Sequence, residues 1–196
     1  MTRIGVAFIS DRAERYLPGC AASFDGRVTG FNVGCHVVDD REHLLGMAGA
    51  VRSAWQWALD DAKVDYLFHI EEDFRFTAPV DLPALAALLD ANPHLAQVVL
   101  KRNPWSPEER AVGGIIEQHP GDYTDRDGYV EHGRIFSLNP CLIPRRVLEL
   151  GWPNGNEAEF TQRCLGAGYR FAFLGGRHDG PLVEHVGMVR GEGWRL

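Results

Sequence analysis

Three consecutive acids, Glu71-Glu72-Asp73, end an apolar segment that begins at Val64. The segment is rich in aromatic and β-branched residues, which is typical of a buried strand. Carboxylates this close together repel one another, so they must reach water or be neutralised by a cation. Oxygen ligands suit a hard divalent ion such as Mg²⁺ or Mn²⁺. The sequence therefore leaves two interpretations, a solvated strand end and a metal site.

Two later segments carry side chains that could join such a site. Glu157 and Glu159 fall in the first turn of a predicted helix over residues 157–166, where the helix dipole favours acids. His185 lies in a short apolar segment near the end of the chain, and imidazole is a common metal ligand. Helix capping and a structural histidine are the alternative explanations.

Further polar residues follow predicted strands or stand in a glycine-rich segment. Ser10 ends the first predicted strand, and Asp39-Asp40 follow the second. Residues 187–196 contain three glycines and Arg190, a composition that suits either a lid over a diphosphate or a frayed terminus.

Predicted strands and helices alternate along most of the chain, which indicates an α/β fold with a mainly parallel central sheet. Asp11 is predicted to cap a helix that follows the first strand. Residues 103–134 are rich in Pro, Gly and acids, and we expect long loops with a small hairpin there. The strands are expected at residues 3–10, 31–38, 64–70, 96–100, 171–174 and 182–186, and the helices at 43–61, 82–90, 145–150 and 157–166.

The composition narrows the class of protein. A chain of 196 residues with 45% hydrophobic and 24% charged residues is typical of one soluble globular domain. No apolar run approaches the ~18 residues of a membrane span, and no signal-peptide pattern opens the chain, which predicts a cytoplasmic protein. A net charge of −7 without a basic block argues against nucleic acid as a partner. The four cysteines lack C-x-x-C spacing, so they do not predict a zinc site.

The acidic motifs, in this order, resemble those of GT-A glycosyltransferases. Glu71-Glu72-Asp73 resembles the D-x-D motif of that family, and residues 156–169 are similar to its E-D-x-D-L-x-x-R-L-x-x-x-G-Y helix. His185-Val186-Gly187 resembles the late H-x-G motif, and Asp39-Asp40 resembles the acids that contact the nucleotide base and ribose. The chain departs from the family at two positions, because Glu71 opens the D-x-D motif and Glu157 stands at the catalytic aspartate.

The resemblance implies a single GT-A-like, Rossmann-related domain over residues 1–196. Its nucleotide-binding half would cover about residues 1–102 and its acceptor and catalytic half about residues 103–196. The implied activity is metal-dependent and inverting, as in family-two-like enzymes, with transfer of a hexose from a nucleoside-diphosphate sugar to an acceptor hydroxyl. The acceptor would be a glycan, a protein or a small molecule, and a homo-oligomer is compatible with the sequence.

The resemblance also implies a role for each candidate residue. Mn²⁺ or Mg²⁺ would be held by Asp73 and His185, with Glu71 as a further ligand. The catalytic base would be Glu157 or Glu159, the register between them being open. The donor would be contacted by Ser10, Asp39, Asp40, Glu71, Glu72 and Arg190.

Two other classes of protein remain open at this point. A nucleotidyltransferase shares the α/β plan and the metal-binding carboxylates, but it usually begins with a glycine-rich, basic phosphate loop. Residues 4–17 contain only Gly5. A non-catalytic module that binds a nucleotide sugar or a glycan is the second alternative, and the presence of both acidic motifs argues against it.

Overall fold

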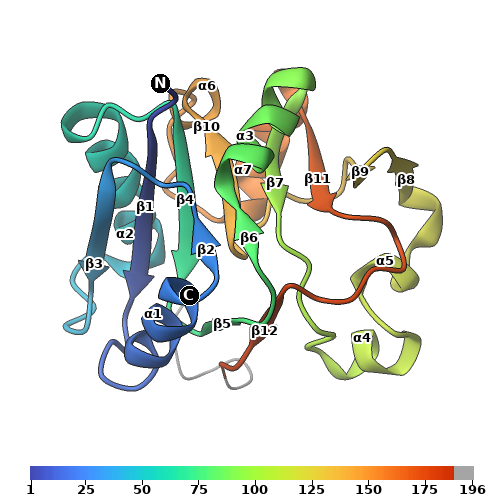
Figure 1. The fold of residues 1–196 in the computed structure, drawn as a ribbon, viewed down its shortest axis with the longest axis horizontal. Helices are drawn as coiled ribbons and strands as arrows, with labels where there is room; N and C mark the ends of the chain where they lie inside the picture. The colour runs from blue at the N-terminus through green and yellow to red at the C-terminus, as the bar shows by residue number, and fades with distance from the viewer. Residues whose placement is uncertain (188–196) are drawn as a thin grey trace.

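A mixed β-sheet of eight strands forms the centre of residues 1–187, the part of the chain that the computed structural model describes (Figure 1). In spatial order the strands are β3 (Gly34–Asp39), β1 (Ile4–Ser10), β4 (Tyr66–Glu71), β10 (Cys141–Pro144), β7 (Leu95–Val99), β11 (Arg170–Leu174), β9 (Tyr129–His132) and β8 (Tyr123–Arg126).

The prediction of a mainly parallel sheet is wrong, because antiparallel strands interrupt it. β1 pairs in parallel with β3 and β4, and β7 pairs in parallel with β11. Between these groups β10 runs antiparallel to both β4 and β7. The chain reaches β10 through residues 133–140, which contain no helix. The helix-and-strand alternation that predicts parallel crossovers is therefore absent where β10 enters the sheet.

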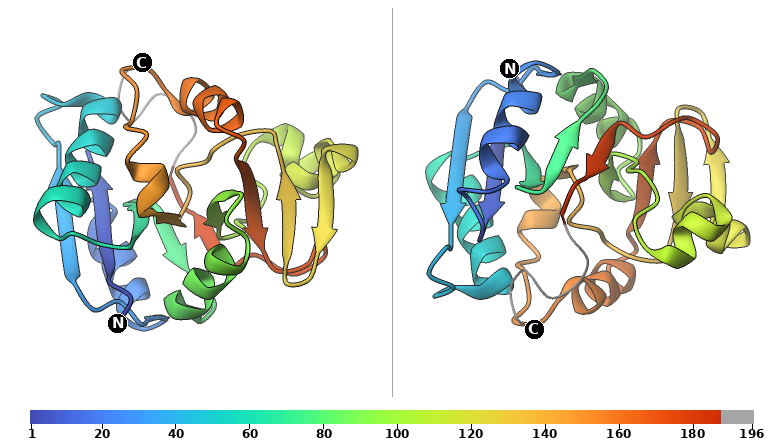
Figure 2. Two further views of the ribbon diagram at one scale, coloured as in Figure 1. Left: turned by 90° about the horizontal axis from the view of Figure 1, so that it is seen from above. Right: turned by 90° about the horizontal axis from the view of Figure 1, so that it is seen from below.

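Helices cover both faces of the sheet (Figure 2). On one face lie α2 (Gly46–Gln56), its continuation as a π-helical turn η1 (Trp57–Asp61), and α7 (Glu157–Gly166). On the other face lie α1 (Leu17–Asp25) and α3 (Leu82–Ala91). Successive side chains of β4 point to opposite faces, so Leu67 joins the first core and Phe68 the second.

The remaining elements are short. β5 (Phe74–Phe76) pairs with β12 (Val183–His185), and β2 (Val28–Thr29) pairs with β6 (Val80–Asp81). The predicted hairpin is confirmed as β8 and β9, joined at Asp127-Gly128, where Gly128 has a φ of 78°. The other short elements are α4 (Pro107–Val112), α5 (Ile115–Gln118), the 3₁₀ turn η2 (Pro120–Asp122) and α6 (Arg145–Leu148).

Asp11 does not cap a helix, contrary to the sequence prediction. α1 begins six residues later at Leu17, with Pro18 in its first turn and Tyr16 as the residue before it. The Asp11 side chain is buried and lies instead 3.0 Å from the Nε atom of Arg12. The acid therefore belongs to the polar end of β1 and not to α1.

An aromatic cluster beneath α7 fixes the position of that helix on the sheet. The ring of Phe160 lies 4.7 Å from that of Phe136, 5.0 Å from Trp152 and 5.1 Å from Trp55, measured between centroids. One helical turn separates Phe160 from Glu157 at the start of α7. The packing of this cluster consequently decides where the Glu157 carboxyl group lies.

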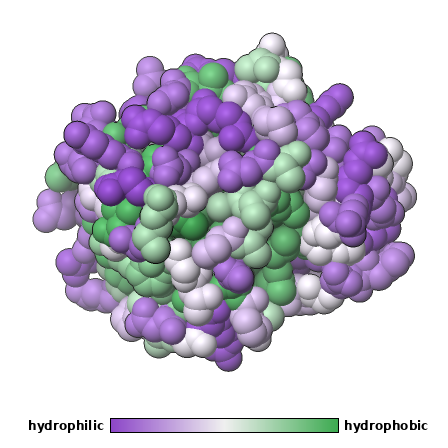
Figure 3. All heavy atoms as spheres, turned by 45° about the horizontal axis from the view of Figure 1, so that its top comes forward, coloured by the Kyte–Doolittle hydropathy of each residue, from purple (hydrophilic) through white to green (hydrophobic). Residues whose placement is uncertain are grey.

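The surface is largely hydrophilic on the face that Figure 3 shows, with hydrophobic residues gathered near its middle. Val37, Leu44 and Val112 are among the exposed large hydrophobic residues. Within residues 1–187, no helix combines the length and the apolar character that crossing a membrane requires.

Replacing Phe160 with alanine should lower the free energy of unfolding by about 3–5 kcal/mol, because it removes a fully buried ring and leaves a cavity. Denaturant unfolding followed by circular dichroism measures this loss. The control is Val112→Ala, at a side chain that is 49% exposed, which should change stability by no more than about 0.5 kcal/mol. Similar stabilities for the two variants would show that the cluster does not anchor α7.

Candidate active site

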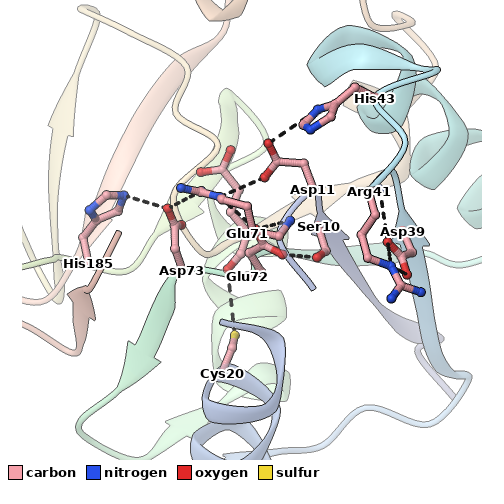
Figure 4. Close-up of polar contacts among 11 residues, drawn as sticks. Ser10, Asp11, Cys20, Asp39, Arg41, His43, Glu71, Glu72, Asp73 and His185 are labelled. Carbon is pink, nitrogen blue, oxygen red and sulfur yellow. Dashed lines mark hydrogen bonds and ion pairs between the residues drawn. The ribbon is translucent and has the colours of Figure 1, made fainter. Parts of the chain in front are cut away.

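The carboxyl ends of β1 and β4 bring the predicted acids together. The two strands are parallel neighbours, and Ile9 is opposite Glu71 in their register. Ser10 donates a hydrogen bond to a carboxylate oxygen of the buried Glu72, whose other oxygen accepts the main-chain N–H of Arg12 at 2.9 Å. Figure 4 shows Ser10, Glu72 and Asp73 side by side at this sheet edge. Ligands of open α/β sheets commonly bind at such an edge.

One guanidinium group, that of Arg12, compensates this concentration of charge. Its Nε atom lies 3.0 Å from Asp11 Oδ1 and 3.2 Å from Glu72 Oε1, and its Nη2 atom lies 3.1 Å from Asp73 Oδ2. Burial lowers the pKa of Arg12, but the charges of Asp11, Asp73 and Glu72 together raise it. We call Asp11, Glu71, Glu72 and Asp73 the acid cluster. Arg12 was not predicted from the sequence, although its place directly after Ser10-Asp11 was a usable signal.

Burial raises the pKa of both glutamates of the acid cluster. For Glu72 it raises the pKa to about 8, and a hydrogen bond with the Asp11 carboxyl group adds to this effect. For Glu71 burial raises the pKa well above its ordinary value, followed by the charges of Asp73 and Glu157.

Asp73 and His185 face one another across the β5–β12 pair. His185 is opposite Phe74 in the register, and its Nε2 atom lies 3.5 Å from Asp73 Oδ2. The imidazole is held between the rings of Phe74 and Trp105, at centroid distances of 4.8 and 5.0 Å. A Cβ atom added at Gly187 would overlap Asp73 Oδ2 and lie 3.1 Å from His185 Cε1. The glycine therefore leaves space for Asp73 and His185 to face each other.

The geometry of this pair fits two ligands of one divalent ion. With metal–ligand bonds of ~2.1 Å, neighbouring octahedral ligands are separated by about 3 Å, close to the 3.5 Å observed. A carboxylate oxygen and an imidazole nitrogen are both suitable donors for Mn²⁺. Within residues 1–187, no group of three or more His, Cys, Asp or Glu residues is arranged to hold a metal ion. An ion at Asp73 and His185 would therefore take its other ligands from a substrate or from water.

Glu157 and Glu159 have different surroundings, although both stand in the first turn of α7. Asn156 caps the helix, since its Oδ1 atom accepts the main-chain N–H groups of Ala158 and Glu159. Glu157 Oε1 accepts the N–H of Leu138 at 2.6 Å. Glu159 is exposed, with its Oε1 atom 3.9 Å from Arg163 Nη2.

The pKa of Glu157 is raised, chiefly by burial, although the Leu138 N–H bond and the charge of Arg102 act in the opposite direction. The charge of Glu157 in turn contributes to the raised pKa of Glu71. Of the two predicted bases, only Glu157 has this electrostatic link to the cluster among the interactions resolved for residues 1–187.

Asp39 ends β3 opposite Ser10 of β1, and the main-chain N–H of Asp40 donates to the Ser10 carbonyl oxygen at 2.7 Å. Asp39 pairs with Arg41 at 2.8 Å, and Figure 4 shows this pair to one side. Asp40 is buried, and its two carboxylate oxygens accept the N–H groups of Leu45 and Gly46 at the start of α2. Arg190 lies outside the described residues.

One hollow borders the acid cluster. It has a volume of about 500 Å³, lies on the β1 side and is lined by Asp11, Arg12, Glu14, Arg15 and Arg41. A second, smaller cavity of about 110 Å³ has Arg102 and Asn139 among its lining residues, but no member of the acid cluster and no residue of α7. Asn139 follows Leu138, the partner of Glu157.

No protein-family profile and no curated protein matches the sequence. Among solved structures, GalNAc-T7 with UDP, GalNAc and Mn²⁺ is similar over 100% of this chain and 45% of that chain, with 13% identity and a TM-score of 0.62. A197 from STIV is similar over 97% of this chain and 100% of that chain, with 14% identity and a TM-score of 0.56. This chain thus spans less than half of the GalNAc-T7 chain. The likeness confirms a GT-A-like α/β fold, while the inverting, family-two-like class remains a prediction.

Replacing Gly187 with alanine should push the carboxylate of Asp73 away from His185, because the new methyl group would occupy the space of Oδ2. We expect Mn²⁺ binding, measured by calorimetry, to weaken by about tenfold or more, the scale reported for disturbed metal surroundings. The control is Gly180→Ala, where an added Cβ atom meets nothing within 4 Å. Equal affinities in the two variants would contradict the assignment of Asp73 and His185 as joint ligands.

Proposed function

We propose that this protein is a metal-dependent glycosyltransferase that transfers a hexose from a nucleoside-diphosphate sugar to an acceptor hydroxyl, with inversion at the anomeric carbon. The observation that carries this proposal is the pair of Asp73 Oδ2 and His185 Nε2, which lie 3.5 Å apart beyond the carboxyl end of β4 and could hold one divalent ion. Glu157, whose Oε1 atom accepts the Leu138 N–H, is the candidate base on α7. The fold shared with GalNAc-T7, whose structure contains UDP, GalNAc and Mn²⁺, supports the proposal.

The nucleoside diphosphate would occupy the hollow of about 500 Å³ beside Arg12. Arg41 lines it and could donate to a phosphate, and Asp39, which pairs with Arg41, could accept from a base or a ribose. Asp40 would also contact the donor. Its carboxylate oxygens already accept two N–H bonds, but each oxygen has a second lone pair for a further bond.

Ser10 and Glu72 would support the donor site from its floor through their shared hydrogen bond. Arg190 stays a proposed donor contact from outside the described residues.

Negative charge grows on the nucleoside diphosphate as it leaves the sugar. A divalent ion, Mn²⁺ or Mg²⁺, held by Asp73 and His185, with Glu71 near, would offset that charge. The side chains of Asp73 and His185 are held in place by β5, β12 and the rings of Phe74 and Trp105. Preorganisation of this kind avoids rearrangement during the reaction.

Glu157 would accept the proton of the attacking hydroxyl group. Its Oε1 atom is engaged by the Leu138 N–H group, which leaves Oε2 for the acceptor. A raised pKa makes this carboxylate a better base near neutral pH than an ordinary glutamate. The acceptor, whether a glycan, a protein or a small molecule, would approach beside Arg102 and Asn139. A single displacement assisted by one base gives inversion.

The direct test is incubation of the protein with Mn²⁺, a panel of nucleoside-diphosphate sugars and candidate acceptors. Release of the nucleoside diphosphate is measured, and the anomeric configuration of the product is read by NMR. We expect release that depends on the acceptor and a product of inverted configuration. A product with retained configuration would contradict the single displacement, and tight donor binding without any release would favour the binding module.

Exchanging Glu157 for glutamine should reduce transfer by ~10²-fold or more, the scale of a lost general base. The amide keeps the size of the side chain and can still accept the Leu138 N–H bond, so donor affinity should change little. Steady-state kinetics and donor calorimetry separate the two effects. The matched control is Glu159→Gln on the exposed side of the same helical turn, which should remain close to wild type.

If Glu159→Gln lost activity while Glu157→Gln kept it, the base would lie two residues further along α7. If both variants kept full activity, a base on this helix would be excluded.

The rate of transfer should rise with pH along one limb of the pH profile. The midpoint of this limb should lie above 4.5, the ordinary pKa of a glutamate, because burial raises the pKa of Glu157. The active form is the carboxylate, so activity is present above the folded-state pKa and is lost as the pH falls through it. Arg102→Gln should move the limb to higher pH, since the charge of Arg102 lowers that pKa. A limb that stays in place in this variant, or moves to lower pH, would argue against Glu157 as the titrating base.

A further inference from the structure

We propose that Arg12 is a resident counter-ion of the acid cluster that exchanges Asp73 for the donor diphosphate when metal and donor bind together. The inference rests on the proposed function for the nature of the donor. Its core statement, that Arg12 and a divalent metal compete for Asp73, depends only on the geometry of the cluster.

The competition concerns one oxygen atom. Asp73 Oδ2 lies 3.1 Å from Arg12 Nη2 and 3.5 Å from His185 Nε2. A metal ion bound to this oxygen would be no more than about 5 Å from the guanidinium nitrogen, given a metal–oxygen bond of ~2.1 Å. Two positive charges at that separation repel one another strongly in partly buried surroundings. A metal ion without the diphosphate must therefore displace Arg12 or bind weakly beside it.

The surroundings of Arg12 allow the exchange without loss of its anchor. Its Nε atom contacts Asp11 Oδ1, and its main-chain N–H is fixed by Glu72, so only the end of the guanidinium group has to change partner. The side chain is 21% exposed, lines the hollow of about 500 Å³ and lies 4.9 Å from the centroid of the Tyr16 ring. A planar guanidinium forms two parallel hydrogen bonds with a phosphate group.

The exchange couples the binding of metal and nucleotide. In the free protein, Arg12 neutralises Asp73 and opposes the metal. When a diphosphate enters, it supplies new anionic partners for both Arg12 and the metal ion. The metal should therefore bind more tightly in the presence of the nucleotide and, by thermodynamic reciprocity, the nucleotide more tightly in the presence of the metal.

The test is calorimetric titration of the full chain with Mn²⁺, with and without saturating UDP, in the wild type, Arg12→Gln and Arg145→Gln. Arg145 is the control because it pairs with one carboxylate, that of Glu149, at the opposite end of the sheet. Arg12→Gln should bind Mn²⁺ alone about tenfold tighter or more, the scale of one removed charge repulsion. The enhancement by UDP should fall by a similar factor, whereas Arg145→Gln should match the wild type.

Mn²⁺ alone binding to folded Arg12→Gln no more tightly than to the wild type would overturn the inference. If this variant does not fold, Arg12→Lys decides, because a lysine lacks the planar fork with which the guanidinium contacts Glu72 and Asp73. It should bind Mn²⁺ alone about threefold tighter or more, and an unchanged affinity would overturn the inference. A wild type that binds Mn²⁺ but neither UDP nor any other nucleoside diphosphate would instead contradict the proposed donor. Absence of Mn²⁺ binding in every variant would contradict both proposals.

Discussion

Glu71, Glu72 and Asp73 bring three carboxyl groups to the end of a buried strand, where their mutual repulsion has to be offset. In the described structure the guanidinium group of Arg12 offsets part of this repulsion, and burial raises the pKa of Glu71 and Glu72. Keeping these charged groups at a buried strand end costs stability. Apolar residues could end the strand without that cost. The cluster makes physical sense as a place prepared for a stronger cation, and the glycosyltransferase proposal follows from that.

The surrounding elements are arranged so that distant parts of the chain reach this strand end. β12 returns beside β5 and brings the His185 imidazole to 3.5 Å from Asp73 Oδ2. The aromatic cluster under α7 sets the start of that helix, and the Leu138 N–H group then fixes the Glu157 carboxylate. The ligand pair and the base are thus carried by separate, well-packed elements, which is how a site keeps its geometry during a reaction.

Much of this could be predicted from the sequence, because local signals carry it. The acid triplet after an apolar run, the helix starting at Glu157 and the late histidine all depend on short-range patterns. The antiparallel β10 could not be predicted, since its four residues resemble any buried strand and its direction depends on how residues 133–140 cross the sheet. The partners of Asp40 and Arg12 could not be predicted for a related reason, because tertiary contacts set them.

The central claim, that Asp73 and His185 hold a metal ion against a nucleoside diphosphate, is tested most directly by a crystal structure with Mn²⁺ and UDP. Anomalous scattering would locate the ion without reference to the protein geometry. The account predicts one manganese peak at ~2.1–2.2 Å from Asp73 Oδ2 and His185 Nε2, with diphosphate oxygens completing its coordination. A manganese ion elsewhere, or UDP bound away from the hollow beside Arg12, would contradict it.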